Sequence, residues 1–237
     1  MKNVLSEYGL EDLAVLDKRP RVLIAIHASH SQPEQMQAQR ETWLRKLYGL
    51  ADYKFFLGHP HCDDADVVSL EIPDGPIWLN QRNGPRTLVL NRKTEGLIKY
   101  AFENEYDYVF KCDDDTYVWP DRLIWSGFEK YDYSGFVERH YARDIGFYNW
   151  AQGGAGYWLS RNAMAIIAQH GLHLVAAEDF AVGQILARHG IHPHHDSRYI
   201  PGATPKDLAN PSQNVLTLHK VAPSEMHLLH DKQSEQR

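Results

Sequence analysis

Three consecutive aspartates, Asp113, Asp114 and Asp115, follow the apolar run YDYVF at residues 106–110. That run is typical of a buried strand, so the acids lie where a core strand is expected to end. Adjacent carboxylates in a place with little water repel one another and are costly to bury. A magnesium or manganese ion, which prefers oxygen ligands, removes that cost. The alternative is a solvated acidic turn before a helix that begins at Pro120, because acids stabilise helix starts.

In strand geometry, Asp113 and Asp115 point to one side and Asp114 to the other. An Asp-x-Asp pair of this kind can bind one metal ion, or one metal ion and one sugar hydroxyl. Magnesium and manganese commonly reach proteins through one or two carboxylates together with the phosphates of a substrate. The pattern therefore suggests a substrate that carries a diphosphate.

Strands and helices are expected to alternate through the first half of the chain. The predicted strands lie at 21–29, 53–58, 64–72, 106–112, 131–138, 155–160 and 215–219, and the predicted helices at 31–49, 85–104, 120–130, 161–171 and 178–190. Residues 139–152 show little periodicity and are predicted to form a loop. The alternation favours a mainly parallel, three-layer α/β sheet, in which ligands collect at the carboxyl ends of the strands. The three aspartates lie at one of those ends.

Composition excludes several classes of protein. The 237 residues suit one large domain or two small ones, and 43% hydrophobic with 24% charged residues is typical of a soluble globular protein. A net charge of −6 argues against a nucleic-acid partner, and no apolar run approaches the roughly 20 residues that span a bilayer. The first 20 residues carry acids among their apolar positions, unlike a signal peptide. The chain has two cysteines, Cys62 and Cys112, so a secreted domain built on disulfides is not expected. A cytoplasmic location is expected instead.

Five blocks occur in a recognisable order. They are AQRETW at 38–43, KTEGLIKYAFENEYDYVFKCDDDTYV at 93–118, GGAGYWLSRNAM at 153–164, EDFAVG at 178–183 and TLHKVAPSEM at 217–226. Together they resemble the β-1,3-glycosyltransferases of glycosyltransferase family 31, most closely its core 1 galactosyltransferase and Fringe branches. The resemblance implies a GT-A type nucleotide-sugar transferase fold in a single catalytic domain at 21–230. An N-terminal extension at 1–20 and a frayed polar tail at 231–237 would flank it.

The resemblance implies a metal site at the aspartates. Asp115 would be the main ligand, Asp113 would reach the metal or the ribose, and Asp113 and Asp114 would contact the donor. His219 matches the family's C-terminal metal-binding histidine, although a lone histidine on a short strand is more often structural. Imidazole suits Mn²⁺ better than Mg²⁺, so manganese is favoured and magnesium remains an alternative.

Asp179 matches the acid proposed as the general base of the family. A carboxylate within hydrogen-bond reach takes the proton of an acceptor hydroxyl while the new C–O bond forms. A metal ion neutralises the departing diphosphate, and attack from the opposite face inverts the anomeric centre. By residue type alone, Glu178 and Asp179 are two acids that stabilise the first turn of a helix.

The block GGAG opens a strand, and its glycines allow a close backbone approach or a tight turn. In the family this block borders the sugar and the acceptor, which places Gly153, Gly154 and the nearby Glu178 at that site. Tyr157 and Trp158 alternate on the same strand. One ring is expected to face the core and the other to stack on a sugar.

Arg40 and Lys93 are the basic residues that the resemblance places near the donor, although either can be a solvated helix charge. The segment HPHHDSRYI at 192–200 offers three histidines and an aspartate. A zinc site there is disfavoured, because no cysteine lies near and strand alternation divides the histidines between two sides. The resemblance makes this segment a loop near the acceptor.

The function expected from these features is a metal-dependent, inverting β-1,3-galactosyltransferase. It would use a UDP-sugar donor, UDP-galactose, and a glycan or glycoconjugate acceptor such as a terminal N-acetylgalactosamine. Transfer of N-acetylglucosamine and a non-catalytic module that binds sugar nucleotides are the alternatives. A metal phosphohydrolase would need additional ligands. The sequence gives no indication of the oligomeric state.

Overall fold

The computed structural model describes residues 19–74, 85–172 and 177–235. The helices are α2 Pro33–Glu41, α3 Pro85–Glu103, α4 Pro120–Ile124, α5 Arg161–His170, α6 Glu178–Arg188, α7 Pro205–Ala209 and α8 Pro223–Glu235, with 3-10 turns η2 Trp43–Leu47 and η3 Phe128–Lys130. The strands are β1 Val22–His27, β2 Asp52–His59, β3 Val67–Pro73, β4 Tyr108–Asp113, β5 Thr116–Val118, β6 Tyr133–Gly135, β7 Val137–Ala142, β8 Gly146–Ala151, β9 Tyr157–Ser160, β10 His194–His195, β11 Tyr199–Ile200 and β12 Thr217–His219. The predicted N-terminal extension, apart from its last two residues, lies outside the described residues.

The central sheet has seven strands in the order β10-β6-β9-β4-β1-β2-β3. Strands β4, β1, β2 and β3 are parallel neighbours, and β9 runs antiparallel to both β4 and β6. Strand β1 is buried along its whole length, as expected for a central strand that is covered on both faces. This arrangement confirms the predicted mainly parallel α/β sheet.

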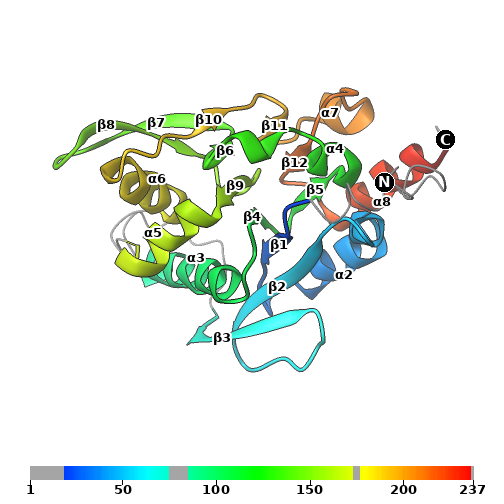
Figure 1. Ribbon diagram of the computed structural model, residues 1–237. Coiled ribbons are helices and arrows are strands. Elements are labelled where there is room, and N and C mark those ends of the chain that lie inside the picture. The colour runs from blue at the N-terminus through cyan, green and yellow to red at the C-terminus, as the bar shows by residue number, and fades with distance from the viewer. Residues whose placement is uncertain (1–18, 75–84, 173–176, 236–237) are drawn as a thin grey trace, which may run out of the picture.

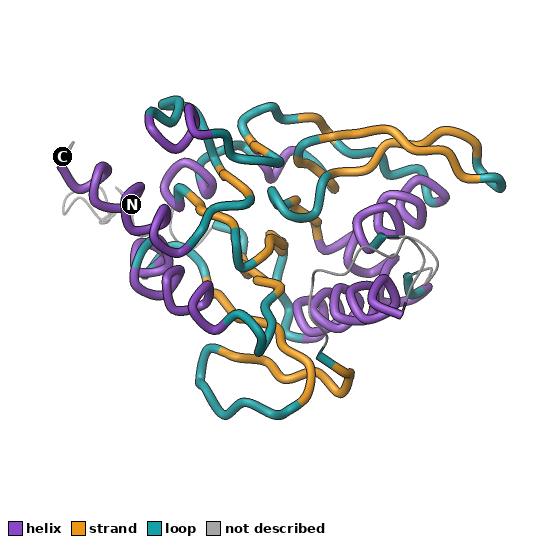
Figure 2. Tube along the Cα trace, turned by 180° about the vertical axis from the view of Figure 1, so that it is seen from behind, coloured by secondary structure: helices purple, strands orange, loops and turns teal. Residues whose placement is uncertain are grey.

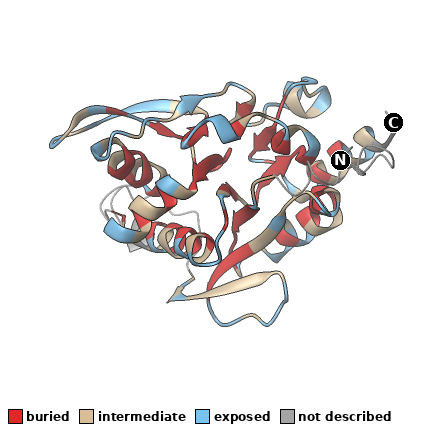
Figure 3. Cartoon of the chain, viewed as in Figure 1, coloured by how far each residue is buried: buried red, intermediate tan, exposed pale blue. Residues whose placement is uncertain are grey.

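Helices cover both faces of the sheet (Figure 1). Ile24 and Ile26 of β1 belong to one hydrophobic cluster, which includes residues of α2 and α8. Leu23 and Ala25 point the opposite way into a second cluster with α3, α5 and α6. The buried residues therefore form two cores, one on each side of the central strands, as Figure 3 shows. Among the described helices, none has the length and apolar character needed to cross a bilayer.

A second sheet of three short strands, β11-β12-β5, lies beside the end of β4. Strand β5 follows β4 after the turn at Asp114 and Asp115, and it pairs antiparallel with β12. In that register His219 lies opposite Thr116. The pairing brings a residue from near the C-terminus to the three aspartates.

The segment predicted as a loop at 139–152 is instead most of the β7–β8 hairpin, which extends from the body of the molecule (Figure 2). The loop prediction was wrong because β7 carries polar residues on both faces and so lacks an apolar alternation. One face is held by tertiary contacts: Phe180 of α6 packs against His140 and Trp150 at centroid distances of 4.5 and 4.3 Å.

Two helix predictions also required correction. The helix predicted at 31–49 is divided into α2 and the 3-10 turn η2, and the helix predicted at 120–130 is divided into α4 and η3. The tail predicted to be frayed from residue 231 continues α8 as far as Glu235. There Lys232 donates hydrogen bonds to the carbonyl oxygens of Leu208 and Ala209, a tertiary contact that local sequence does not reveal.

Packing of α6 against β8 depends on a glycine. A Cβ atom at Gly183 would lie 2.4 Å from Cβ of Trp150 and 3.0 Å from its Cα. We expect Gly183→Ala to lower the free energy of unfolding by about 1–3 kcal/mol through overpacking. Urea unfolding measures this. The control is Gly96→Ala in α3, whose Cβ would meet the methyl groups of Leu70 at 2.9 and 3.0 Å. Both glycines lie inside helices, so alanine favours each helix equally, by about 1 kcal/mol. The Leu70 methyl groups can shift whereas the backbone of Trp150 cannot, so equal losses would contradict the explanation.

Candidate active site

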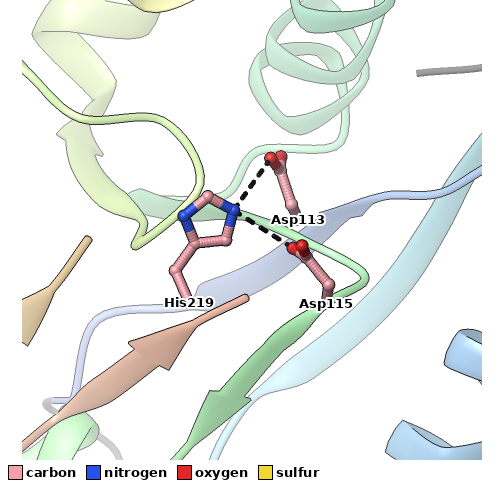
Figure 4. A group of neighbouring side chains, drawn as sticks. All are labelled: Asp113, Asp115 and His219. Carbon is pink, nitrogen blue, oxygen red and sulfur yellow. Dashed lines mark ion pairs between the residues drawn. The ribbon is translucent and has the colours of Figure 1, made fainter. Parts of the chain in front are cut away.

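Two of the three aspartates point toward a histidine from the second sheet (Figure 4). Asp113 is the last residue of β4, and Asp115 lies in the turn to β5. The Nε2 atom of His219 lies 3.2 Å from Oδ1 of Asp115 and 3.9 Å from Oδ2 of Asp113. The structure thus brings together the three residues that the sequence predicts as metal ligands.

The second nitrogen of His219 determines which way the ring presents its lone pair. Nδ1 lies 2.7 Å from the carbonyl oxygen of Pro201, which can only accept a hydrogen bond. In the neutral ring, Nδ1 therefore carries the hydrogen and Nε2 turns its lone pair toward the two carboxylates. A histidine oriented by a backbone carbonyl in this way is typical of metal ligands.

The donor atoms of these three residues fit a divalent cation. One ligand atom from each lies within 4.8 Å of the others, and Oδ1 of Asp115 is buried without a hydrogen-bond partner in the described chain. Burial alone would lower the pKa of His219, but its contact with Asp115 and the charge of Asp113 raise it, so the position favours positive charge. Two carboxylates and an imidazole suit manganese or magnesium.

Two adjacent glycines allow the backbone to approach this cluster closely. A Cβ at Gly154 would lie 2.0 Å from Cε1 of His219, and a Cβ at Gly153 would lie 2.2 Å from Oε1 of Glu178. No side chain fits at either position without displacing those groups. Gly153 and Gly154 therefore form a narrow backbone link between the histidine and the start of α6.

Lys111 is a charged member of the site that the sequence analysis missed. Its ammonium lies 2.7 Å from Oδ1 of Asp113, 2.7 Å from Oε1 of Glu178 and 3.3 Å from the carbonyl oxygen of Gly153. Burial alone would lower the pKa of Lys111, but the neighbouring charges of Asp113 and Glu178 raise it. The available signal was strand periodicity, because Lys111 and Asp113 are two residues apart and share a face.

Asp179 lies in the first turn of α6, beside the glycine link. Its Oδ2 accepts a hydrogen bond of 3.0 Å from the backbone N–H of Gly153, and its Oδ1 accepts one of 2.9 Å from Phe180. Burial, and then the charge of Glu178, raise the pKa of Asp179 to about 7. A carboxyl group with a pKa near neutrality is suited to exchange a proton with a substrate.

Glu178 was predicted to contact the acceptor, but both oxygens of its buried side chain are occupied. Oε1 accepts from Lys111, while Oε2 accepts from the hydroxyl groups of Thr94 at 3.2 Å and Tyr157 at 3.1 Å. In this arrangement Glu178 anchors the start of α6, and its contact with an acceptor stays a prediction.

The prediction that Tyr157 or Trp158 stacks on a sugar does not agree with the structure, in which both rings are fully buried. They point to opposite faces of β9, and each enters a different hydrophobic core. The Trp158 ring stacks on Phe128 with 3.8 Å between centroids. Both faces of this central strand are covered, so the expected exposed ring does not occur.

Asp114 and Lys93 lie at the same edge of the sheet and are buried. Asp114 Oδ2 has no hydrogen-bond partner within the described ranges, and burial, followed by the charges of Asp113 and Asp115, raises the pKa of Asp114. Lys93 lies 2.7 Å from Asp74 and also donates to a backbone carbonyl. Lys93 is therefore half of a buried ion pair, whereas Asp114 keeps a free acceptor.

The structure does not bring Arg40 to this group. Its guanidinium pairs with Asp66 at 2.7 Å and Asp64 at 2.9 Å, next to the start of β3. Arg40 also lines a surface groove of about 930 Å³ that includes Asp52, the first residue of β2. The start of β3 is level with the end of β4 in the strand register, but β1 and β2 lie between these two strands, so the partners of Arg40 lie beside the outer strand and away from Asp113.

Two histidines of the segment 192–196 have partners at the edge of the central sheet. The ring of His194 stacks on Tyr131 at 3.8 Å, and Nδ1 of His195 accepts a hydrogen bond from the backbone N–H of Val137. The segment follows α6 and leads to β11, and its two-residue strand β10 pairs with β6. Its histidines thus pack the edge of the sheet.

Comparisons with known proteins agree with this fold. No protein-family model matches the chain. The human and mouse proteins named beta-1,3-galactosyltransferase 1 are both 24% identical over 257 aligned positions, covering 92% of this chain and 75% of theirs. The crystal structure of a glycosyltransferase involved in the glycosylation of the major capsid of PBCV-1 covers 89% of this chain and all of its own, with a TM-score of 0.51 and 12% identity. A Pyrobaculum calidifontis mannosyltransferase, PcManGT, solved with GDP-Man and Mn²⁺, covers 76% of this chain and 56% of its own, with a TM-score of 0.43 and 14% identity.

The fold is a GT-A type α/β fold, as the sequence predicted. The similarities support a glycosyltransferase with a candidate metal site at Asp113, Asp115 and His219. Membership of family 31 stays a prediction, because the identity is 24% and no family model matches.

The metal site predicts a stabilisation that depends on Asp115. Addition of Mn²⁺ should raise the melting temperature, because a ligand that binds the folded state at 100 times its Kd contributes about 2.7 kcal/mol. Asp115→Asn should lose most of this rise, since it removes a charged ligand atom. Differential scanning fluorimetry measures both. Asp63→Asn is the control, because its side chain is 99% exposed and lies outside the cluster. A full Mn²⁺ response in Asp115→Asn would contradict the assignment.

Proposed function

We propose that this protein is a metal-dependent, inverting β-1,3-glycosyltransferase that transfers galactose from UDP-galactose to a glycan acceptor. The observation that carries the proposal is the joint arrangement of two sites. The candidate metal ligands Asp113, Asp115 and His219 lie on one side of the Gly153–Gly154 link, and Asp179 lies on the other. The names of the curated relatives support galactose as the donor sugar and a β-1,3 linkage.

The donor end of the reaction is assigned to the end of β4. Asp113, Asp115 and His219 would hold a divalent ion, for which we favour Mn²⁺ over Mg²⁺ because one ligand is an imidazole. When bound, this ion neutralises the charge that develops on a departing diphosphate. Oδ2 of Asp114, which has no hydrogen-bond partner among the residues that the structure describes, is a suitable acceptor for a donor hydroxyl group.

The acceptor end is assigned to Asp179. Its carboxylate takes the proton of the acceptor hydroxyl as the acceptor oxygen bonds to the anomeric carbon and the bond to the diphosphate breaks. The backbone N–H of Gly153 fixes one oxygen of this carboxylate. Attack on the face opposite the diphosphate converts an α-linked donor into a β-linked product.

A donor screen tests the proposal directly. The protein is incubated with each UDP-sugar, Mn²⁺ and an N-acetylgalactosamine glycoside, and products are identified by mass. We expect a hexose to be added with UDP-galactose, and no product after chelation with EDTA. If a product forms only with UDP-N-acetylglucosamine, the donor is UDP-N-acetylglucosamine and the assignment of UDP-galactose is wrong. The absence of product and of UDP release with every donor would refute the transferase.

The raised pKa of Asp179 predicts a pH dependence. A general base works in its deprotonated form, so kcat should rise with pH by about tenfold per unit below 7 and level off above it. The charged groups that face Asp179 are Glu178 and Lys111. Asp179→Asn should lower kcat by about 10²-fold or more and abolish the rise of kcat with pH below 7, while the binding of UDP and Mn²⁺ stays nearly intact. Full turnover in Asp179→Asn would remove Asp179 from the mechanism.

A further inference from the structure

One buried ammonium group connects the strand of the metal site to the helix of the base. A lysine has three N–H donors, and Lys111 directs them at three acceptors, on Asp113, Glu178 and Gly153. These acceptors belong to β4, to the first turn of α6, and to the backbone between β8 and β9. Lys111 is therefore a direct link between three elements that are separate in the sequence.

The ion pair between Lys111 and Glu178 is almost completely shielded from water. The two side chains are 1% and 8% exposed. Taking both charges out of water is costly, and an apolar pair of similar volume commonly gives equal or greater stability. Stability is thus a weak reason for this pair, whereas hydrogen bonds to charged groups fix directions that apolar contacts leave loose.

The other oxygen of Glu178 is held just as firmly. Oε2 accepts hydrogen bonds from Thr94 of α3 and Tyr157 of β9, so the carboxylate is fixed from α3, β4 and β9. Asp179 is the next residue along the helix. Oδ2 of Asp179 accepts a hydrogen bond from the N–H of Gly153, and the carbonyl oxygen of Gly153 accepts one from Lys111. These contacts and the Lys111–Glu178 pair therefore form a closed ring.

We propose that Lys111 and Glu178 are positioning residues that hold the base at a fixed separation from the metal-binding carboxylate. The inference rests on the proposed transferase function. In an inverting transfer, the acceptor oxygen and the departing diphosphate lie on opposite sides of one carbon atom. The base and the metal site must keep the matching separation, and a displacement of about 1 Å can cost 10²-fold in rate.

A displaced base should change the fate of the donor. In transfer, the acceptor hydroxyl supplies the new C–O bond and its proton passes to Asp179, while the bond from the anomeric carbon to UDP breaks. In hydrolysis, a water molecule supplies the oxygen and the proton instead, and the products are UDP and free sugar. Water is small and mobile, so hydrolysis depends less on the position of the base than transfer does.

The test compares transfer with hydrolysis in Glu178→Gln. This variant keeps the size of the side chain and loses the charge that binds Lys111. We expect kcat for transfer to fall by about 10²-fold, with donor KM and the calorimetric affinity for UDP with Mn²⁺ essentially unchanged. UDP release without acceptor should fall much less, so the ratio of hydrolysis to transfer rises. Ile167→Ala is the control, because this buried residue of α5 lies in the second core and should lose stability without a change in the ratio.

A second variant tests the inference if the first variant does not fold. If Glu178→Gln does not fold, Lys111→Met/Glu178→Met replaces the ion pair by an apolar pair and should show the same rise in the ratio. An unchanged ratio in the folded variant would overturn the inference while the transferase stands. A wild-type protein that releases no UDP from any donor would overturn both.

Discussion

Carboxylates from two distant parts of the chain meet at the end of β4, and the Lys111 ammonium between them makes their burial tolerable. Asp113 ends a central strand, and Glu178 begins a helix 67 residues further along the chain from Lys111. The buried Glu178 and the partly buried Asp113 would be costly without a partner, and together they would also repel one another. The ammonium thus links the first turn of α6 to β4, while apolar residues of α6 pack in the second core.

The two oxygens of the Asp113 carboxylate face two different kinds of positive charge. Oδ1 of Asp113 accepts from Lys111, which leaves Oδ2 on the side of His219 and Asp115. A fixed ammonium therefore compensates the inner side of the site, and the outer side is open to a divalent ion. On that outer side, Oδ1 of Asp115 lies 3.2 Å from Nε2 of His219.

The glycine link joins the two halves of the site and limits what can lie between them. Gly154 permits the close approach of His219, and Gly153 contacts Lys111 and Asp179 through its backbone. The link continues directly from the β7–β8 hairpin, which packs against α6 through Phe180. The candidate metal ligands, Asp179 and the hairpin are thus parts of one continuous set of contacts.

The sequence by itself determined the features that depend on local periodicity. Strand alternation predicted Asp113 and Asp115 on one side, and the structure brings both to His219, although Asp115 lies in a turn. Apolar patterns predicted the central strands and the long helices α3, α5 and α6. The position of His219 came from a resemblance in an ordered block, and pairing of β12 with β5 brings it to the aspartates.

Only the tertiary structure decided the contacts between residues far apart in the chain. It placed Lys111 against Glu178, closed both faces of β9 over Tyr157 and Trp158, and paired Arg40 with Asp66 beside the outer strand β3. Sequence spacing reports which face of an element a side chain occupies. It does not report which distant charge or aromatic ring will cover that face, because that depends on how the elements pack.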